Sequence, residues 1–182
     1  MNTKQDFLKL SFTLILSCLL SITAGAQTVI LYRSSAQDTT KQYYLFSYFL
    51  NEHQGMCYAI STDGISWKPL NNSKPYLTPN IGKEKLMRDP SINLGPDSVY
   101  RVVWTTGWKD THIGYAYSKD LIHWSTERLL PVMKGIPGAK MSWAPEIFYD
   151  NIQHKYMIYW SSAVDTVWSI YYTLTEDFKQ FT

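Results

Sequence analysis

Cysteine is scarce in this chain of 182 residues. There are two, Cys18 and Cys57, and Cys18 lies in an N-terminal segment that we expect to be removed. The single remaining cysteine excludes an internal disulfide, so packing and hydrogen bonds must stabilise the fold. For an exported protein, this lack of disulfides fits a bacterial envelope better than a eukaryotic secretory route.

An excess of charge of one sign is also lacking. The 17 basic and 15 acidic side chains give a formal net charge of +2, which provides no electrostatic basis for binding nucleic acid or an anionic membrane surface. The four histidines show no metal-ligand spacing. The chain has no glycine-rich phosphate loop, serine nucleophile elbow or Cys–His pairing. We therefore expect no metal, no cofactor and no nucleic-acid partner.

Long apolar runs are confined to the N-terminus. Lys4 and Lys9 precede an apolar run from Leu10 to Leu20, and residues 24–26 (AGA) match a small-x-small cleavage site. This pattern predicts a signal peptide over residues 1–26, because the apolar run is too short to cross a bilayer. No membrane span is expected elsewhere. We expect residues 27–182 to be exported to the periplasm or exterior of a bacterial cell.

Aromatic residues, in contrast, make up 15% of the chain. They occur in short segments rich in β-branched residues, separated by Gly, Asn, Asp and Pro, and no segment shows sustained helical periodicity. These features predict an all-β fold. Most of the rings should lie in the core, although aromatic faces also suit a carbohydrate site.

An internal repeat is the strongest pattern. Residues 58–67 (YAISTDGISW) recur as 115–124 (YAYSKDLIHW) and, more weakly, as 172–181 (YTLTEDFKQF), with the same offset both times. One position of the repeat holds Asp63, Asp120 and Asp177. Each of these aspartates follows a predicted strand, where a turn Asp accepts backbone hydrogen bonds, so we assign them a structural role.

Each copy of the repeat extends to a four-stranded unit. Two strands are predicted upstream of each copy, at residues 28–32 and 43–49, 88–94 and 100–108, and 143–149 and 156–163. A weaker fourth strand is predicted around 68–70 or 76–77, and at 127–133. Four-stranded units of fixed period are typical of a β-propeller.

The number of units is small for a propeller. The units cover about residues 27–80, 81–137 and 138–182, and the third stops where its fourth strand should begin. Three blades cannot close a ring without leaving an edge uncovered. We expect a fragment of a longer protein, or completion of the ring by partner chains. A plain β-sandwich is a third possibility, but it leaves the period unexplained.

Two carboxylates are candidates for catalysis. Asp89 in MRDPSI and Glu146 in WAPEI are separated by the offset of the repeat, so we predict that they share one position on adjacent inner strands, with Tyr32 there in the first unit. Inner strands line the axis of a propeller, and glycoside hydrolysis needs a pair of carboxyl groups. The alternative is structural: an Arg88–Asp89 ion pair and a turn cap by Glu146.

Four tryptophans lie on or beside the strands nearest the predicted axis: Trp104, Trp108, Trp143 and Trp160. Strand alternation predicts that about half of them face the core. Trp108 and Trp143 each stand at a strand end, so they are the candidates for sugar contact.

Several of these segments together resemble glycoside hydrolase family 43: MRDPSI (87–92), VVWTTGW (102–108), GYAYSKDLIHW (114–124) and WAPEIFY (143–149). They are most similar to an arabinofuranosidase-like branch from gut Bacteroides-type bacteria. The resemblance implies a five-bladed propeller, of which about three blades are present. It also implies an inverting enzyme acting on arabinose- or xylose-containing oligo- or polysaccharides.

The resemblance further implies residue roles. Asp89 would be the general base, and Glu146 would tune or supply the acid, with the family's general acid expected on a later blade. Apart from the resemblance, we predict that Arg88 contacts substrate together with Trp108 and Trp143. Family 32, which cleaves sucrose and fructans, is the second resemblance; there Arg88-Asp89 would stabilise the transition state and Glu146 would be the acid. A non-catalytic sugar-binding propeller is the third possibility.

Overall fold

The computed structural model of the protein describes residues 29–33, 42–51 and 54–182. The predicted signal peptide lies outside this part of the chain. Within it, every regular element is a strand except one short 3-10 turn, η2 (Asn71–Ser73). No helix among the described residues is long and apolar enough to cross a membrane.

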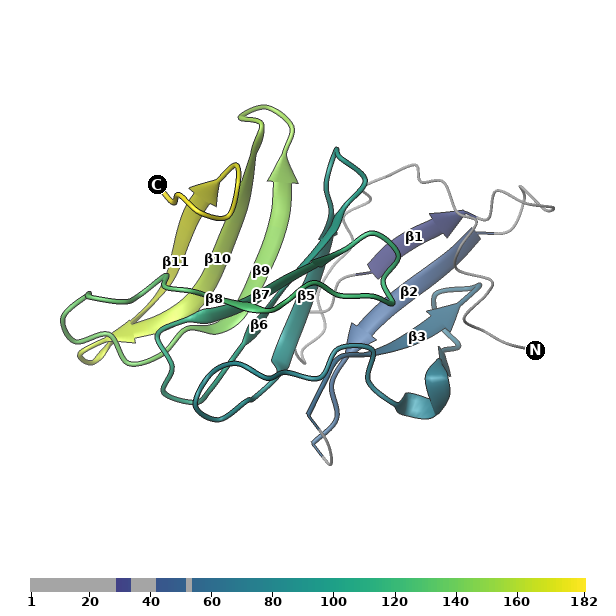
Figure 1. Cartoon of the computed structure of the whole chain (residues 1–182), viewed down its shortest axis with the longest axis horizontal. Coiled ribbons are helices and arrows are strands. Elements are labelled where there is room, and N and C mark those ends of the chain that lie inside the picture. Colours follow the sequence, from purple (N-terminus) through teal and green to yellow (C-terminus); the bar gives the residue numbers. More distant parts are fainter. Residues whose placement is uncertain (1–28, 34–41, 52–53) are drawn as a thin grey trace.

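The strands form three antiparallel meanders that follow one another along the chain (Figure 1). The first sheet contains β1 (Val29–Arg33), β2 (Gln42–Tyr48), β3 (Cys57–Ser61) and β4 (Lys68–Pro69). The second contains β5 (Arg88–Leu94), β6 (Tyr100–Thr105), β7 (Ile113–Ser118) and β8 (Arg128–Leu130). The third contains β9 (Trp143–Asp150), β10 (Lys155–Val164) and β11 (Val167–Thr175). The prediction of an all-β fold built from consecutive meanders is confirmed.

Some predicted strands end at other residues. β6 ends at Thr105 rather than at 108, because the Thr106 hydroxyl donates to Asp110 Oδ2 at 3.0 Å and holds a turn there. The fourth strand of the first sheet is Lys68–Pro69, and Leu77 forms only an isolated bridge with Met56. The fourth strand of the second sheet is shorter than predicted. In the third sheet, Thr182 exchanges two backbone hydrogen bonds with Leu174, at 2.9 and 3.0 Å.

The second sheet is buried on both faces, which explains why its middle strand reads as an almost continuous apolar run. Val102 and Trp104 of β6 face the first sheet and join a core with Leu45 and Tyr58. Val103, on the opposite face, joins a second core, together with Ile113, Tyr115, Ile158 and Trp160. Because successive residues of a strand point to opposite faces, one strand contributes to both cores.

The repeated aspartates have the structural role predicted for them. Asp63 Oδ1 accepts from the backbone N–H groups of Ile65 and Ser66 at 2.8 and 2.7 Å. Asp120 and Asp177 make the corresponding pairs of hydrogen bonds, at 2.8–3.0 Å. Each turn therefore reverses the chain after the third strand of its sheet.

The outer face of the third sheet is rich in exposed apolar side chains. Tyr159, Ile170 and Tyr172 are 36%, 68% and 65% exposed. Their counterparts in the second sheet, Val103, Ile113 and Tyr115, are buried under the third sheet. The third sheet thus exposes an apolar face, and the second sheet buries the equivalent face of its own strands.

Candidate active site

Both candidate carboxylates lie near a β-bulge on an inner strand. In β5, Arg88 pairs with Thr105 and Ser91 with Val103, so Asp89 and Pro90 together oppose the single residue Trp104. Proline has no N–H to donate to the ladder, and a bulge is one of the places where a sheet accepts it. Asp89 has a φ of 50°, a left-handed conformation that Asp tolerates better than most residues.

The inner strand of the third sheet repeats this device. Glu146 pairs with Tyr159 and Trp143 with Ser161, so Ala144 and Pro145 oppose one residue. Ala144 has a φ of 46°, close to that of Asp89. Ala144 is therefore the structural counterpart of Asp89.

The prediction that Asp89 and Glu146 share one position is wrong. The counterpart of Glu146 is Ser91, since each of these two residues directly follows the bulge proline of its own strand. The offset of the repeat holds at the third strands, where Tyr172 corresponds to Tyr115. Between equivalent paired positions, however, each of the two hairpins of the third sheet is longer by a single residue than its counterpart in the second sheet. Together the added residues shift the inner strand relative to the repeat seen in the sequence.

The structure nevertheless brings Asp89 and Glu146 into one electrostatic environment. Glu146 is half-buried, and the Ser91 hydroxyl donates to its Oε2 at 2.7 Å. Burial raises the pKa of Glu146; the Ser91 hydrogen bond opposes this, and the negative charge of Asp89 adds to it. Like charges at close range disfavour ionisation of both groups.

Asp89 differs from Glu146 in its neighbours. Burial raises the pKa of Asp89, while the positive charge of Arg88 and a hydrogen bond with the Thr105 side chain oppose that effect. A cation thus favours the ionised form of Asp89, whereas an anion disfavours the ionised form of Glu146. Burial raises the pKa of both carboxyl groups, and they differ in the sign of the charge that lies nearby.

Arg88 lies between the first and second sheets. Its Nη1 donates to Gln54 Oε1 and to the Met87 carbonyl, both at 2.9 Å. Its guanidinium lies 4.8 Å from the centre of the Phe49 ring and 5.9 Å from that of Trp108. These contacts hold the guanidinium beside aromatic rings, where cation–π attraction stabilises it.

Two of the four tryptophans are core residues and two are not. Trp104 and Trp160 are buried, whereas Trp108 is 52% exposed and Trp143 is half-buried. Trp143 Nε1 donates to the Trp108 carbonyl at 3.1 Å, and the two rings meet edge to face at 6.0 Å. The prediction that about half of these rings face the core is confirmed, and the two non-core rings lie together.

Comparison with known proteins identifies the chain at the level of family. A family model described as a probable glycosyl hydrolase domain, related to family 43, matches residues 40–182. The chain belongs to this family. No curated protein matches the sequence.

Solved structures share the fold of this glycosyl hydrolase domain. A glycosyl hydrolase from Bacteroides ovatus matches with a TM-score of 0.54 and 15% identity, over 86% of this chain and 47% of that one. A Bombyx mori family 32 β-fructofuranosidase matches with a TM-score of 0.56 and 16% identity, over 86% and 36%. An exo-β-1,3-galactanase from Phanerochaete chrysosporium matches with a TM-score of 0.55 and 14% identity, over 90% and 38%. The chain thus spans less than half the length of each.

The sequence pattern missed several residues that contact the carboxylates, Arg88 or Trp143 in the glycosyl hydrolase domain. They are Gln54, Ser91, Thr105, Tyr159 and Trp168. Tyr159 pairs directly with Glu146, and the Trp168 ring lies 5.5 Å from that of Trp143. The sequence indicates only Ser91 among these residues, because aligning the two prolines of the inner strands gives Ser91 and Glu146 the same position.

Metal-binding geometry is not found in the described part of the glycosyl hydrolase domain. Among residues 29–33, 42–51 and 54–182, no three His, Cys, Asp or Glu side chains are grouped as ligands. His112 and His123 each hydrogen-bond a nearby aspartate, at 2.8 and 2.7 Å.

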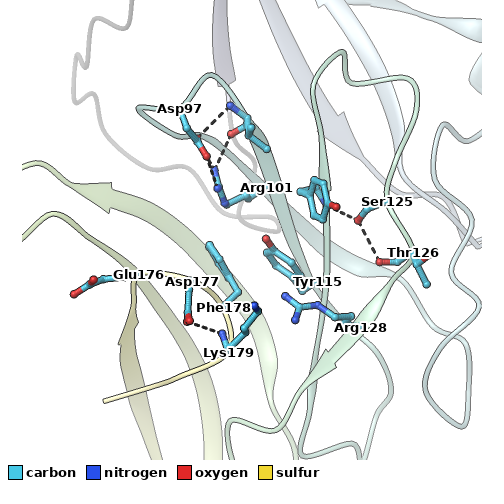
Figure 2. Close-up of a pocket in the computed structure, with 12 residues that line it drawn as sticks. Asp97, Arg101, Tyr115, Ser125, Thr126, Arg128, Glu176, Asp177, Phe178 and Lys179 are labelled. Carbon is cyan, nitrogen blue, oxygen red and sulfur yellow. Dashed lines mark hydrogen bonds and ion pairs between the residues drawn. The ribbon is translucent and has the colours of Figure 1, made fainter.

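A cavity of about 620 Å³ lies where the second and third sheets meet (Figure 2), and neither Asp89 nor Glu146 lines it. There Arg101 forms a two-point ion pair with Asp97 and lies over the rings of Tyr156 and Phe178. The Phe178 ring also stacks on Tyr115 at 4.4 Å. These contacts join the second and third sheets, so this region stabilises the interface between the two sheets whose inner strands carry the carboxylates.

Proposed function

We propose that the protein is an inverting glycosidase that cleaves α-L-arabinofuranosyl or β-D-xylosyl linkages, with Asp89 as the general base. The family assignment supports glycoside hydrolysis, and the resemblance to the arabinofuranosidase-like branch of family 43 supports the sugar class. The observation that carries the residue roles is the charge beside each half-buried carboxyl group, a cation beside Asp89 and an anion beside Glu146.

In this mechanism Asp89 accepts a proton from a water molecule while the oxygen of that water attacks the anomeric carbon. The bond from that carbon to the leaving-group oxygen breaks, and the oxygen takes a proton from a general acid. Inverting enzymes hold the two carboxyl groups about 6.5–9.5 Å apart to leave room for the water. Glu146 is the carboxyl better suited to hold a proton, so it supplies the acid's proton or raises the pKa of an acid on a later blade.

Substrate binding would use the aromatic rings beside Arg88. Trp108 and Trp143 present one exposed and one half-buried indole, and the planar faces of such rings match the apolar faces of sugars. Trp168, 55% exposed, extends this group. We propose that the Arg88 guanidinium, held by Gln54 beside Trp108, donates to sugar hydroxyls.

Replacing Asp89 with Asn in the full-length protein tests the base assignment. We expect kcat on aryl α-L-arabinofuranosides or β-D-xylosides to fall by about 10²–10⁴-fold, the usual contribution of a general base. The melting temperature should not fall, because burial already disfavours the charged form of Asp89. Asp165→Asn, at an exposed turn aspartate, is the control. Retained activity in Asp89→Asn would refute the assignment.

The family 32 arrangement is the second candidate. The environment of Glu146 favours it, since burial and the charge of Asp89 both raise the pKa of this carboxyl, as an acid requires. If Glu146 donates the proton, Glu146→Gln should lose activity on sugars with poor leaving groups but keep it on dinitrophenyl glycosides, which need no protonation. Proton NMR of the first-formed anomer, with arabinan fragments and sucrose as substrates, separates inversion from retention.

A sugar-binding protein without catalysis is the remaining candidate. It predicts that the wild-type protein releases no sugar from any of these substrates yet binds arabinan fragments in calorimetry. Binding that weakens in Trp108→Ala, together with absent hydrolysis, would establish it in place of the enzyme.

A further inference from the structure

We propose that Ser91 is a positioning residue that holds Glu146 at a fixed place relative to Asp89 and keeps Glu146 Oε2 as a hydrogen-bond acceptor. This inference rests on the proposed function for its catalytic meaning, although its structural part does not. Ser91 lies on β5 two residues after Asp89, and its side chain is fully buried. A contact from Ser91 to Glu146 therefore fixes one carboxyl with respect to the strand that carries the other.

The hydrogen bonds of Ser91 determine the direction of this contact. The Ile147 N–H donates to Ser91 Oγ at 3.3 Å, and Ser91 Oγ donates to Glu146 Oε2 at 2.7 Å. A hydroxyl has a single proton, and in this arrangement it is directed at Oε2. While this hydrogen bond is kept, Oε2 acts as an acceptor, so a proton on Glu146 is accommodated on Oε1. The hydroxyl thus favours Oε1 as the oxygen of Glu146 that donates.

A second buried hydroxyl makes a parallel contact from the neighbouring strand. Thr105 Oγ1 accepts from the Ala144 N–H at 2.8 Å, and the Thr105 side chain hydrogen-bonds the Asp89 carboxyl. Each carboxyl is thereby contacted by a hydroxyl of the second sheet that also accepts an N–H of β9. The two bulged strands are joined at the position of the carboxylates, so the docking of the second and third sheets controls the spacing between these groups.

Loss of the Ser91 hydroxyl should change Glu146 without changing substrate contacts. Ser91 is buried and does not reach solvent, so KM should change little. Glu146 would lose a donor that favours its ionised form and would become less well placed. We expect its pKa to rise by about one unit, the value of one hydrogen bond. We expect kcat to fall by about 10–100-fold, with a matching upward shift of the pH profile.

The experiment compares Ser91→Ala with wild type in the full-length protein, by ¹³C NMR titration of labelled Glu carboxyls and by pH profiles of kcat and KM. Ser162→Ala is the matched control, because Ser162 is equally buried but donates to the Met141 carbonyl at 2.6 Å. Ser91→Cys, of similar shape and a weaker donor, should give an intermediate shift, and it decides the question if Ser91→Ala does not fold.

An unchanged Glu146 titration in the Ser91 variants, or an equal change in Ser162→Ala, would overturn the proposal. Failure of the proposed function looks different. In that case wild type hydrolyses no glycoside, yet the titration of Glu146 still shifts in Ser91→Ala. A shifted titration with an unchanged kcat in an active enzyme would show that Ser91 contacts Glu146 but does not position it, and would also overturn the proposal.

Discussion

At the scale of single residues, the three turn aspartates show how one side chain determines local structure. Each accepts two backbone N–H groups with a single carboxylate oxygen. This role could be predicted from the sequence because it is local, within three residues of the aspartate. The contact from Ser91 to Glu146 joins residues 55 positions apart, and no local pattern could reveal it.

The pH dependence of stability should report on these aspartates. Burial raises the pKa of Asp120, but hydrogen bonds from His123 and from the backbone outweigh it and lower the pKa from 3.8 to about 2. A lowered folded-state pKa adds stability that is complete above pH 3.8 and is lost as the pH falls towards 2.

Replacing Asp120 with Asn should therefore lower the free energy of unfolding by about 1–2 kcal/mol at neutral pH. The loss should shrink towards pH 2, where wild type has also lost the charge. Denaturant unfolding between pH 2 and pH 7 measures this difference. Glu176→Gln is the control, since its carboxylate lies on the surface, 3.5 Å from Lys155 Nζ. A loss in Asp120→Asn that is equal at all pH values would contradict the argument.

At the scale of strands, the apolar pattern predicted most elements but could not predict the register of the inner ones. The strands at 88–94 and 143–150 begin where the sequence indicated. Their bulges and the lengths of the hairpins beside them are not visible in alternation of apolar and polar residues. For this reason the sequence repeat aligns Asp89 with Glu146. In the folded strands, the position equivalent to Glu146 is that of Ser91.

Close packing between neighbouring strands gives a prediction about Gly114. Gly114 of β7 lies opposite Trp104 of β6, and a Cβ added to Gly114 would overlap the indole ring. Trp104 is fully buried and cannot move outward. We expect Gly114→Ala to destabilise the fold by about 1–3 kcal/mol or more, the usual cost of overpacking a core.

Thermal unfolding of Gly114→Ala, Trp104→Phe and the double variant checks this. Because the smaller Phe ring makes room for the methyl group, the double variant should lose less stability than the sum of the single variants. Strict additivity would show that the glycine is needed for another reason.

At the scale of the whole molecule, packing between sheets explains both the apolar composition and the exposed face of the third sheet. The repeat could predict three stacked meanders because each copy carries the same strand pattern. It could not predict which inner residues meet, since that depends on how neighbouring sheets dock. Ile170 and Tyr172 remain 68% and 65% exposed, in positions whose counterparts are buried.

This face should promote self-association of the chain. We expect Ile170→Lys combined with Tyr172→Lys to lower the sedimentation coefficient observed at high protein concentration, because charged side chains oppose burial of the face. Ile152→Lys is the control: Ile152 is 89% exposed but lies in the β9–β10 turn, outside the face. If the unmodified chain sediments as a monomer at every concentration, the prediction is wrong.

The unequal hairpins have a consequence for how copies of such a unit diverge. A residue added to a hairpin shifts the inner strand relative to its neighbour and changes which side chain is presented beside the adjoining sheet. In the third sheet a glutamate thus holds the position that a serine holds in the second. A change in hairpin length can thus change the chemistry of an inner strand while the buried strands keep their composition.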